Sequence, residues 1–221
     1  MHYGQNNPKH IYHINGTLLT PCKTYKDLGV MVSDNLKASE QIDKCVTKAN
    51  SMLGMIKRTF STIDEEIFLK TYKAFVRPIL EHCQPVWSPY LQKDIDSIEK
   101  IQRRATKLVP GLKKLSYEER LMKLKLFTLE ERRIRGDMIL LYKMFHGHVD
   151  FNPNKLFTVN TDNRTRGHSL KIKTERSNKD IRSYFYTNRV VPLWNSLPDN
   201  IISSINVSQF KRNYDKYFLT K

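Results

Sequence analysis

Residues 95–109 read IDSIEKIQRRATKLV, and this stretch indicates a helix more clearly than any other part of the chain. At about 100° per residue, its apolar positions gather on one side of a helix and its basic positions lie roughly opposite. The apolar positions are Ile98, Ile101, Ala105, Leu108 and Val109. Helical periods recur on both sides of this stretch, and we therefore expect a mainly α fold with a bundle-like helical region.

Two earlier stretches carry the same period. The first places Ile42, Val46, Ala49, Leu53, Ile56 and Phe60 at spacings of four and three residues. The second places Phe68, Tyr72, Phe75, Val76 and Ile79 on one side of the next helix. We expect Arg77-Pro78 to kink or end that second helix, because proline lacks an amide donor and restricts the residue before it.

The helix around residues 95–109 should stop at Pro110-Gly111, and two capping boxes follow it. Ser116 with Glu119 opens a short helix, and Thr128 with Glu131 opens a longer one. In each box the hydroxyl accepts from an orphan amide and the glutamate reaches back. The longer helix should end near Gly147 and bury the apolar side chains of Ile134, Met138, Leu141 and Phe145.

The first 36 residues have a β pattern instead. Ile11–Ile14 and Thr17–Leu19 flank Asn15-Gly16, a dipeptide typical of a two-residue hairpin turn in which both residues have positive φ. A third strand is expected over Tyr25–Val32, interrupted at Gly29. So small a β-hairpin or three-strand element should pack against something else.

The pattern predicts four parts: a β element (1–36), a helical region (37–147), an irregular basic loop (148–180) and a C-terminal helical segment (181–221). Within the loop only Ser169–Lys173 alternates like a strand. The last part should contain a helix over Ile181–Trp194, broken around Pro192, and another that begins at Ser208.

The chain carries a large positive charge on a sequence that can still fold. It has 38 Lys and Arg against 22 Asp and Glu, a formal charge of +16, and 39% of its 221 residues are hydrophobic. A field of this sign attracts polyanions, nucleic acid first and an acidic membrane second. No apolar run approaches the roughly 20 residues needed to span a bilayer, so we expect no membrane segment.

The basic side of residues 95–109 is the best candidate for a polyanion site. Lys100, Arg103, Arg104 and Lys107 recur at helical spacing, and Glu99 is the one acid close to them. A solvated helix face usually mixes signs, so the excess favours contacts to phosphates. The basic positions of the window 100–135 extend the candidate site with Lys113, Lys114, Arg132, Arg133 and Arg135. The loop adds a second patch with Arg164, Arg166, Lys171 and Lys173.

Catalytic and metal-binding patterns are missing from the sequence. Cys22, Cys45 and Cys83 are an odd number at long spacing, which favours reduced thiols in an intracellular compartment and no zinc. No two aspartates are adjacent and no glycine-rich phosphate loop is present. Two-metal polymerase or nuclease chemistry needs convergent carboxylates. We therefore expect no enzyme activity, no cofactor and no small-molecule ligand.

Several strings in order carry a resemblance to a known family. They are TYKDLGV at 24–30, FVRPILE at 75–81, IEKIQRRATK at 98–107, LEERR at 129–133, RGH at 166–168 and RVVPLWNSLP at 189–198. Over roughly residues 11–221 the set resembles the C-terminal part of reverse transcriptases from jockey-like non-LTR (LINE-type) retrotransposons. The family is an RNA-directed DNA polymerase with fingers, palm and thumb, usually behind an endonuclease domain.

The resemblance implies that the strands belong to the end of a palm and the helices to a thumb and C-terminal extension. It places Lys26, Asp27, Leu28 and Gly29 near the region that holds the primer. The family's aromatic-x-Asp-Asp motif lies upstream and is missing here, as are the endonuclease ligands, so polymerase activity does not carry over. Met1 would then be a start within a truncated element copy.

The sequence therefore predicts a non-catalytic fragment that binds a template–primer duplex, RNA or an RNA–DNA hybrid through phosphates, in the cytoplasm or nucleus. The alternative is a non-catalytic module that binds a protein partner, which would complete the sheet of the exposed N-terminal strands. A continuous positive groove would favour the first reading, and a neutral surface over residues 100–135 would favour the second.

Overall fold

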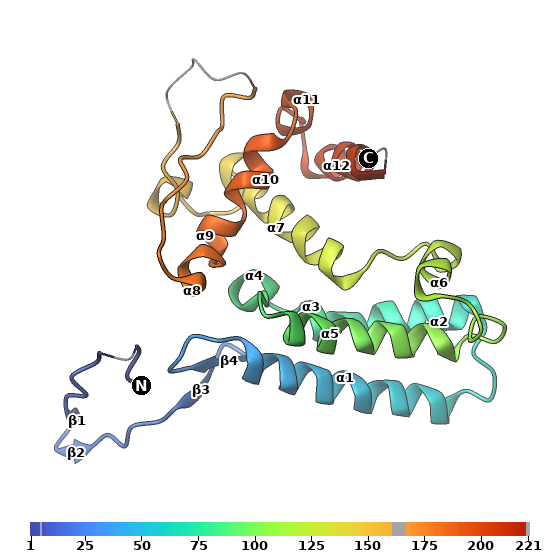
Figure 1. Cartoon of the computed structure of the whole chain (residues 1–221), viewed down its shortest axis with the longest axis horizontal. Helices are drawn as coiled ribbons and strands as arrows, with labels where there is room; N and C mark the ends of the chain where they lie inside the picture. Colours follow the sequence, from blue (N-terminus) through green and yellow to red (C-terminus); the bar gives the residue numbers. More distant parts are fainter. Residues whose placement is uncertain (5, 161–166, 220–221) are drawn as a thin grey trace. The chain divides into compact units, whose positions relative to one another are not determined.

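A computed structural model describes residues 1–4, 6–160 and 167–219. It is mainly helical, with two small two-stranded antiparallel sheets near the N-terminus, which confirms the predicted fold class (Figure 1). The chain divides into two compact units, a first unit of Met1–Glu131 and a second unit of Arg132–Lys221. The boundary lies within helix α7 (Leu129–Phe145), so it does not coincide with the divisions expected after residues 36, 147 and 180.

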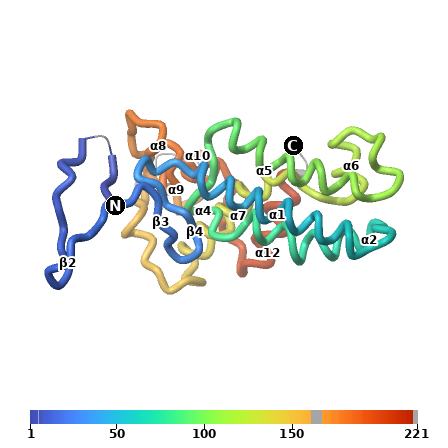
Figure 2. Tube along the Cα trace, turned by 90° about the horizontal axis from the view of Figure 1, so that it is seen from below, coloured from blue at the N-terminus to red at the C-terminus, as the bar shows by residue number. Residues whose placement is uncertain are grey.

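The first hairpin of the first unit forms as its turn dipeptide predicts. Strand β1 (His13–Ile14) pairs antiparallel with β2 (Thr17–Leu18), and Ile14 lies opposite Thr17. Asn15 and Gly16 have φ of 47° and 76°, the positive values that a two-residue turn of this kind requires. In two views at right angles this hairpin stands apart from the helices of its unit (Figures 1 and 2).

The single third strand expected over Tyr25–Val32 is wrong, because this segment forms a second hairpin. Strand β3 (Thr24–Asp27) pairs antiparallel with β4 (Val30–Ser33) in a sheet of its own. Leu28 and Gly29 have φ of 43° and 91°, and two consecutive positive φ values reverse the chain. The buried Val30 then joins the helical core.

Three helical segments follow the second hairpin. They are α1 (Ser39–Thr59), α2 (Glu65–Thr71) with its continuations η1 (Tyr72–Val76) and α3 (Arg77–Glu81), and the short α4 (Gln84–Trp87). Of the kink or end expected at Arg77-Pro78, the end does not occur. The η1 segment is a π-helix whose Arg77 amide donates to the carbonyl of Tyr72, five residues earlier, and the helical path continues past the proline. Such π-turns occur mostly as single insertions within α-helices.

The rest of the first unit follows the predicted starts and stops. Helix α5 (Gln92–Ala105) continues as the 3₁₀ turn η2 (Thr106–Leu108), and α6 (Tyr117–Leu124) follows. Both capping boxes form: the Glu119 amide donates to Ser116 Oγ at 3.2 Å, and the Glu131 amide to Thr128 Oγ1 at 3.1 Å. Both glutamate carboxylates accept from the amide of their capping residue.

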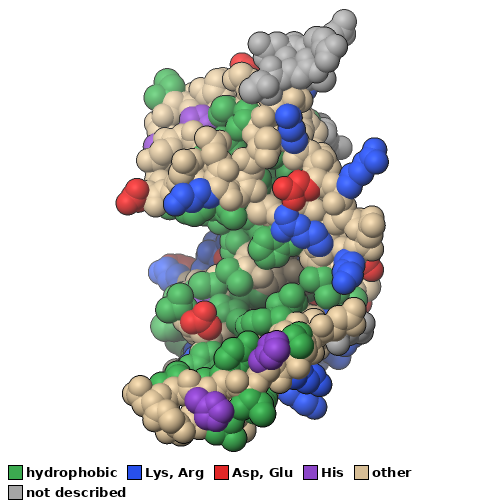
Figure 3. All heavy atoms as spheres, turned by 90° about the vertical axis from the view of Figure 1, so that its left-hand side faces the viewer, with side chains coloured by type: hydrophobic (Ala, Val, Ile, Leu, Met, Phe, Trp, Pro, Cys, Tyr) green, Lys and Arg blue, Asp and Glu red, His purple; other side chains and the backbone are tan. Residues whose placement is uncertain are grey.

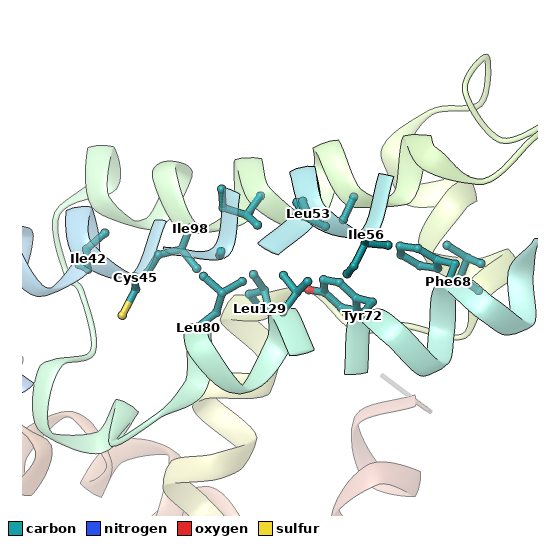
Figure 4. Close-up of a cluster of buried hydrophobic side chains, with 14 of the residues drawn as sticks. Ile42, Cys45, Leu53, Ile56, Phe68, Tyr72, Leu80, Ile98 and Leu129 are labelled. Carbon is teal, nitrogen blue, oxygen red and sulfur yellow. The ribbon is translucent and has the colours of Figure 1, made fainter. Parts of the chain in front are cut away.

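The core of the first unit lies between α1, the α2–α3 path and α5 (Figure 4). The predicted stripe of α1 is mostly correct, since Ile42, Ala49, Leu53 and Ile56 are buried. Val46 and Phe60 are only partly buried, and Cys45 takes a core position that the stripe did not include. Fully burying one such aliphatic side chain stabilises a fold by about 1.5–3 kcal/mol.

The second unit contains the remainder of α7 and a set of short helices. Its further elements are η3 (Pro153–Lys155), α8 (Asp180–Ser183), α9 (Tyr186–Arg189), α10 (Val191–Ser196), α11 (Asp199–Ile202) and α12 (Val207–Leu219). A helix broken around Pro192 was expected over Ile181–Trp194; three short helices form there, and Pro192 lies in the first turn of α10. Of the strand expected over Ser169–Lys173, the described residues show a single bridge between Val159 and Ile172.

The core of the second unit gathers around Trp194, which is fully buried. Its indole nitrogen donates to the carbonyl of Leu170 at 2.7 Å, and the neighbouring Asn195 amide bonds both the amide and the carbonyl of Ile172. These bonds hold the segment that contains Leu170 and Ile172 against α10. On α7, Met138 and Leu141 are buried as expected, but Ile134 is 40% exposed.

Candidate nucleic-acid interface

Helix α5 separates its apolar and basic sides as the sequence predicts. Ile98, Ile101 and Ala105 are at most 2% exposed and belong to the core of the first unit. The basic positions Lys100, Arg103, Arg104 and Lys107 are all exposed, the last of them on η2. From Lys100 to Lys107 an α-helix advances about 10 Å. The four cations are therefore spread over about 10 Å, and more than one phosphate can lie within their reach.

Glu99, which precedes Lys100 in the sequence, is turned inward. It is 8% exposed, and its carboxylate accepts hydrogen bonds from the Tyr117 hydroxyl and from the Leu129 amide, the latter at 3.0 Å. That amide is at the start of α7, where the helix dipole favours a negative charge. Burial, followed by the bond to Glu99, raises the pKa of Tyr117 well above its usual range. The Glu99 carboxylate therefore bonds groups in the protein interior and does not neutralise the exposed cations.

Gln102 connects the same interior network to two further elements. It is fully buried, and its carbonyl oxygen accepts from the Tyr72 hydroxyl at 2.6 Å. Its amide nitrogen donates to the Tyr117 hydroxyl and to the carbonyl of Phe127, both at 2.9 Å. A side-chain amide that bonds η1, α6 and the segment before α7 fixes the rotation of α5 about its axis. The basic side is thereby held outward.

Two of the four cations are oriented by neutral partners. The Arg103 guanidinium lies 4.2 Å from the centre of the Tyr117 ring, and Arg104 donates to Asn50 Oδ1 on α1 at 3.1 Å. Cation–π stacking keeps the full positive charge available. Within the part of the chain that the structure describes, none of the four forms an ion pair.

The loop after η2 adds Lys113 and Lys114, both exposed. The buried Leu112 anchors this loop in the core immediately before them. Two acids of the window have structural roles: Glu119 and Glu131 complete the capping boxes, and the Ser116 backbone bond, followed by its hydroxyl, lowers the pKa of Glu119. The basic surface, defined here as Lys100, Arg103, Arg104, Lys107, Lys113 and Lys114, therefore lies on one unit.

Two candidates of the second unit are corrected. Arg133 is 4% exposed, so its side chain cannot reach a phosphate on the surface. Arg135 forms a two-point ion pair with Asp215 on α12, at 2.5 and 2.8 Å, and this pairing uses its charge inside the unit. Arg132 is half-buried. Runs of arginine at a helix start give no signal of which side faces the core, and the sequence analysis therefore included all three.

The loop patch is described only in part. Arg164 and Arg166 lie outside the described residues. Lys173 is exposed, and Lys171 is half-buried beside Gly167, whose backbone has φ of 122°. The two lysines flank the bridge residue Ile172. They belong to the second unit, whereas the basic surface of α5 belongs to the first.

The primer-grip-like residues occupy the second hairpin. Lys26 and Asp27 end β3, and Leu28 and Gly29 form the turn, with all four exposed and Leu28 at 90%. A Cβ at Gly29 would meet the ring of His82 at 3.4 Å. The turn therefore lies against the end of α3, on the same unit as α5.

The described residues show none of the patterns of metal sites, disulfides and membrane spans. Across residues 1–4, 6–160 and 167–219, no three His, Cys, Asp or Glu side chains gather as metal ligands would. Cys22 and Cys83 are exposed free thiols, and Cys45 is a buried one. No helix in the described chain has the length and apolar character needed to cross a bilayer.

Sequence reasoning missed the polar residues that orient α5. Asn50 and Gln102 are isolated polar residues within helical stretches, and the neighbouring sequence does not indicate which residues they bond. Gln102 interrupts an apolar spacing between Ile98 and Ala105, and this interruption is the one available signal for a buried amide. Comparison with known proteins found no matching family model, curated protein or solved structure.

Proposed function

We propose that this chain binds nucleic acid through phosphate contacts on the basic surface of α5, η2 and the loop that follows. One observation carries the proposal: six exposed cations share this region, while the neighbouring acid Glu99 is buried and bonded to Tyr117 and Leu129. A solvated surface of ordinary function would place acids among the cations. Here Glu99 is directed into the interior and Glu119 and Glu131 bond the amides of their capping residues, while Asp96, one turn before Lys100, is exposed.

The expected ligand is an RNA or RNA–DNA duplex, in keeping with the resemblance to the thumb and C-terminal part of non-LTR reverse transcriptases. The residues of the surface are lysines and arginines of α5, η2 and the following loop, and the Asn50 side-chain amide beside them accepts a hydrogen bond from Arg104. Such a set contacts phosphates and carries little sequence information. Binding is therefore weakly sequence-dependent and strongly salt-dependent.

On this proposal the isolated chain is a fragment without polymerase activity, and it acts inside the cell. The aspartate pair of the family is absent from the sequence, and two-metal primer extension requires convergent carboxylates. Primer extension on an RNA template with Mg²⁺ or Mn²⁺ tests this part. Template-dependent product from the purified chain would refute it.

The binding proposal is tested by salt dependence. Each phosphate neutralised contributes a slope of about −0.9 in log K against log salt for duplex DNA and about −0.7 for single strands. Changing Lys100, Arg103, Arg104 and Lys107 to Ala should flatten the slope by roughly 3 to 4 units if each meets one duplex phosphate. Affinity for a mixed-sequence RNA–DNA hybrid is measured across a salt series, with circular dichroism as the fold check.

The matched control removes the same charge elsewhere on the first unit. Lys44, Lys48, Lys70 and Lys73 are exposed on α1, α2 and η1, and changing them to Ala should leave most of the slope intact. Equal losses in both variants would mean that net charge, and not this surface, sets the affinity. A wild-type chain without salt-dependent binding would end the nucleic-acid proposal.

A second candidate function is a protein interaction through the N-terminal strands. Its supporting observation is the exposure of large apolar side chains on and beside both hairpins (Figure 3). They include Ile11, Tyr12, Ile14, Leu18, Tyr25 and Leu28, each at least 57% exposed. Unpaired strand edges invite pairing with another chain. Contacts of this kind persist at high salt, so salt resistance of a captured partner separates the two candidates.

A further inference from the structure

The partner of Arg104 shows that α1 lies beside the basic surface. Arg104 donates to Asn50 on α1, and near the start of both helices Ser39 Oγ donates to Asp94 Oδ2 at 2.7 Å. The paired residues are 54 and 55 positions apart in sequence, so the two helices run parallel in nearly constant register. Figure 1 shows α1 and α5 side by side along most of their length.

This register brings Lys57 to the end of the basic surface. At about 3.6 residues per turn, Lys57 lies five turns after Ser39 and two turns after Asn50, on the same side of α1. It lies about 10 Å farther along α1 than Asn50, the partner of Arg104, and therefore beyond the level of the last turn of α5. Its side chain is exposed, and no acid pairs with it among the described residues.

Gly54 lies between Asn50 and Lys57 on that side of α1. Glycine in a helix interior is unfavourable relative to other residues. Packing in this chain does not require it, since an added Cβ would meet only the end of the flexible Arg58 side chain, at 3.5 Å. A position that tolerates a side chain but has none allows another backbone to approach closely.

We infer that α1 forms the second side of the nucleic-acid site, with Lys57 as a further phosphate contact and Gly54 as the place where the ligand backbone comes closest. This inference rests on the proposed binding function and extends it from one helix to two. The strand that follows Lys100 to Lys107 along α5 then continues past Gly54 toward Lys57, Lys113 and Lys114.

The charge test compares Lys57→Glu with Lys48→Glu. Lys48 is exposed on the same helix, but at about 100° per residue it lies roughly 160° around α1 from Asn50. Binding to an RNA–DNA hybrid is measured across a salt series for the wild type and both variants. Lys57→Glu should flatten the slope by about 1 unit, as expected for one phosphate contact, and Lys48→Glu should keep the wild-type slope.

The shape test uses Gly54→Leu, which changes no charge. A better helix former should raise the thermal midpoint of the chain, while the added bulk should weaken binding and leave the salt slope unchanged. A purely structural role of Gly54 predicts unchanged or stronger binding in the more stable variant, and that result would overturn the close approach.

The outcomes separate the two claims. Suppose that the wild type binds and that changing Lys100, Arg103, Arg104 and Lys107 to Ala flattens the salt slope. If Lys57→Glu then behaves like Lys48→Glu, the second side of the site is refuted and the proposed function stands. If the wild type shows no salt-dependent binding, the proposed function itself fails. Loss of slope in Lys57→Glu alone, together with weaker binding by Gly54→Leu, supports the two-helix site.

Discussion

Replacing Gln102 with Leu should destabilise the first unit far more than a substitution at any exposed position of α5. Gln102 is fully buried and makes three hydrogen bonds, to Tyr72, Tyr117 and the carbonyl of Phe127. Leucine of similar size leaves the Tyr72 hydroxyl and the Phe127 carbonyl without this partner. The Tyr117 hydroxyl still donates to Glu99.

The magnitude follows from these orphaned groups. A buried polar group left without a partner costs about 1–3 kcal/mol. Two such groups give a loss of about 2–6 kcal/mol, against a typical domain stability of about 5–15 kcal/mol. The matched control is Gln92→Leu on the same helix, where the exposed amide bonds Asp96 at 2.9 Å. Surface changes of this kind usually stay within about 0.5 kcal/mol.

Urea titration monitored by hydrogen exchange of the α5 segment measures both variants, because it reports the first unit separately. Gln102→Leu should shift the midpoint strongly and Gln92→Leu should shift it little. Equal small shifts would show that the buried amide does not hold α5, and the account of how the basic side is oriented would be wrong.

Two further predictions concern titratable groups. Burial raises the pKa of Cys45, so iodoacetamide near pH 8 should alkylate the exposed Cys22 and Cys83 first in the native chain; peptide mass spectrometry showing Cys45 modified earlier would contradict this. Burial lowers the pKa of His168 below its ordinary 6.5, so the unfolded chain binds a proton that the folded second unit resists. Stability of that unit should be full above about pH 6.5 and fall as the pH drops below it, and His168→Gln should flatten this dependence in urea titrations. If the stability of His168→Gln depends on pH as strongly as that of the wild type, other groups cause the dependence.

Local signals predicted much of the fold because their physics is contained in a few neighbouring residues. Asn15-Gly16 specified its turn, and Ser116 and Thr128 specified two helix starts, since positive φ and orphan amides are local requirements. Leu28-Gly29 was missed as a turn because leucine rarely adopts positive φ. The continuation past Pro78 depends on a π-turn, which has no dependable sequence signal.

Helical spacing predicted the exposure of the central basic residues but not the burial or pairing of the outer ones. Helical spacing located Lys100 to Lys107 because an apolar stripe fixes which side of α5 faces water. Arg133 and Arg135 follow a capping box on a helix whose two sides are less distinct, and only packing shows that one is buried and the other paired with Asp215. The proposed contribution of α1 rests on the contact of Arg104 with Asn50, which joins residues 54 positions apart.

Lysine footprinting tests the central claim most directly. The chain is acetylated with and without a mixed-sequence RNA–DNA hybrid at low salt, and the modified lysines are quantified by mass spectrometry. The account predicts protection of the exposed Lys100, Lys107, Lys113 and Lys114, with Lys44 and Lys48 as reactive as in the free chain. Equal reactivity of all six lysines in the presence of saturating hybrid, or protection confined to Lys44 and Lys48, would contradict it.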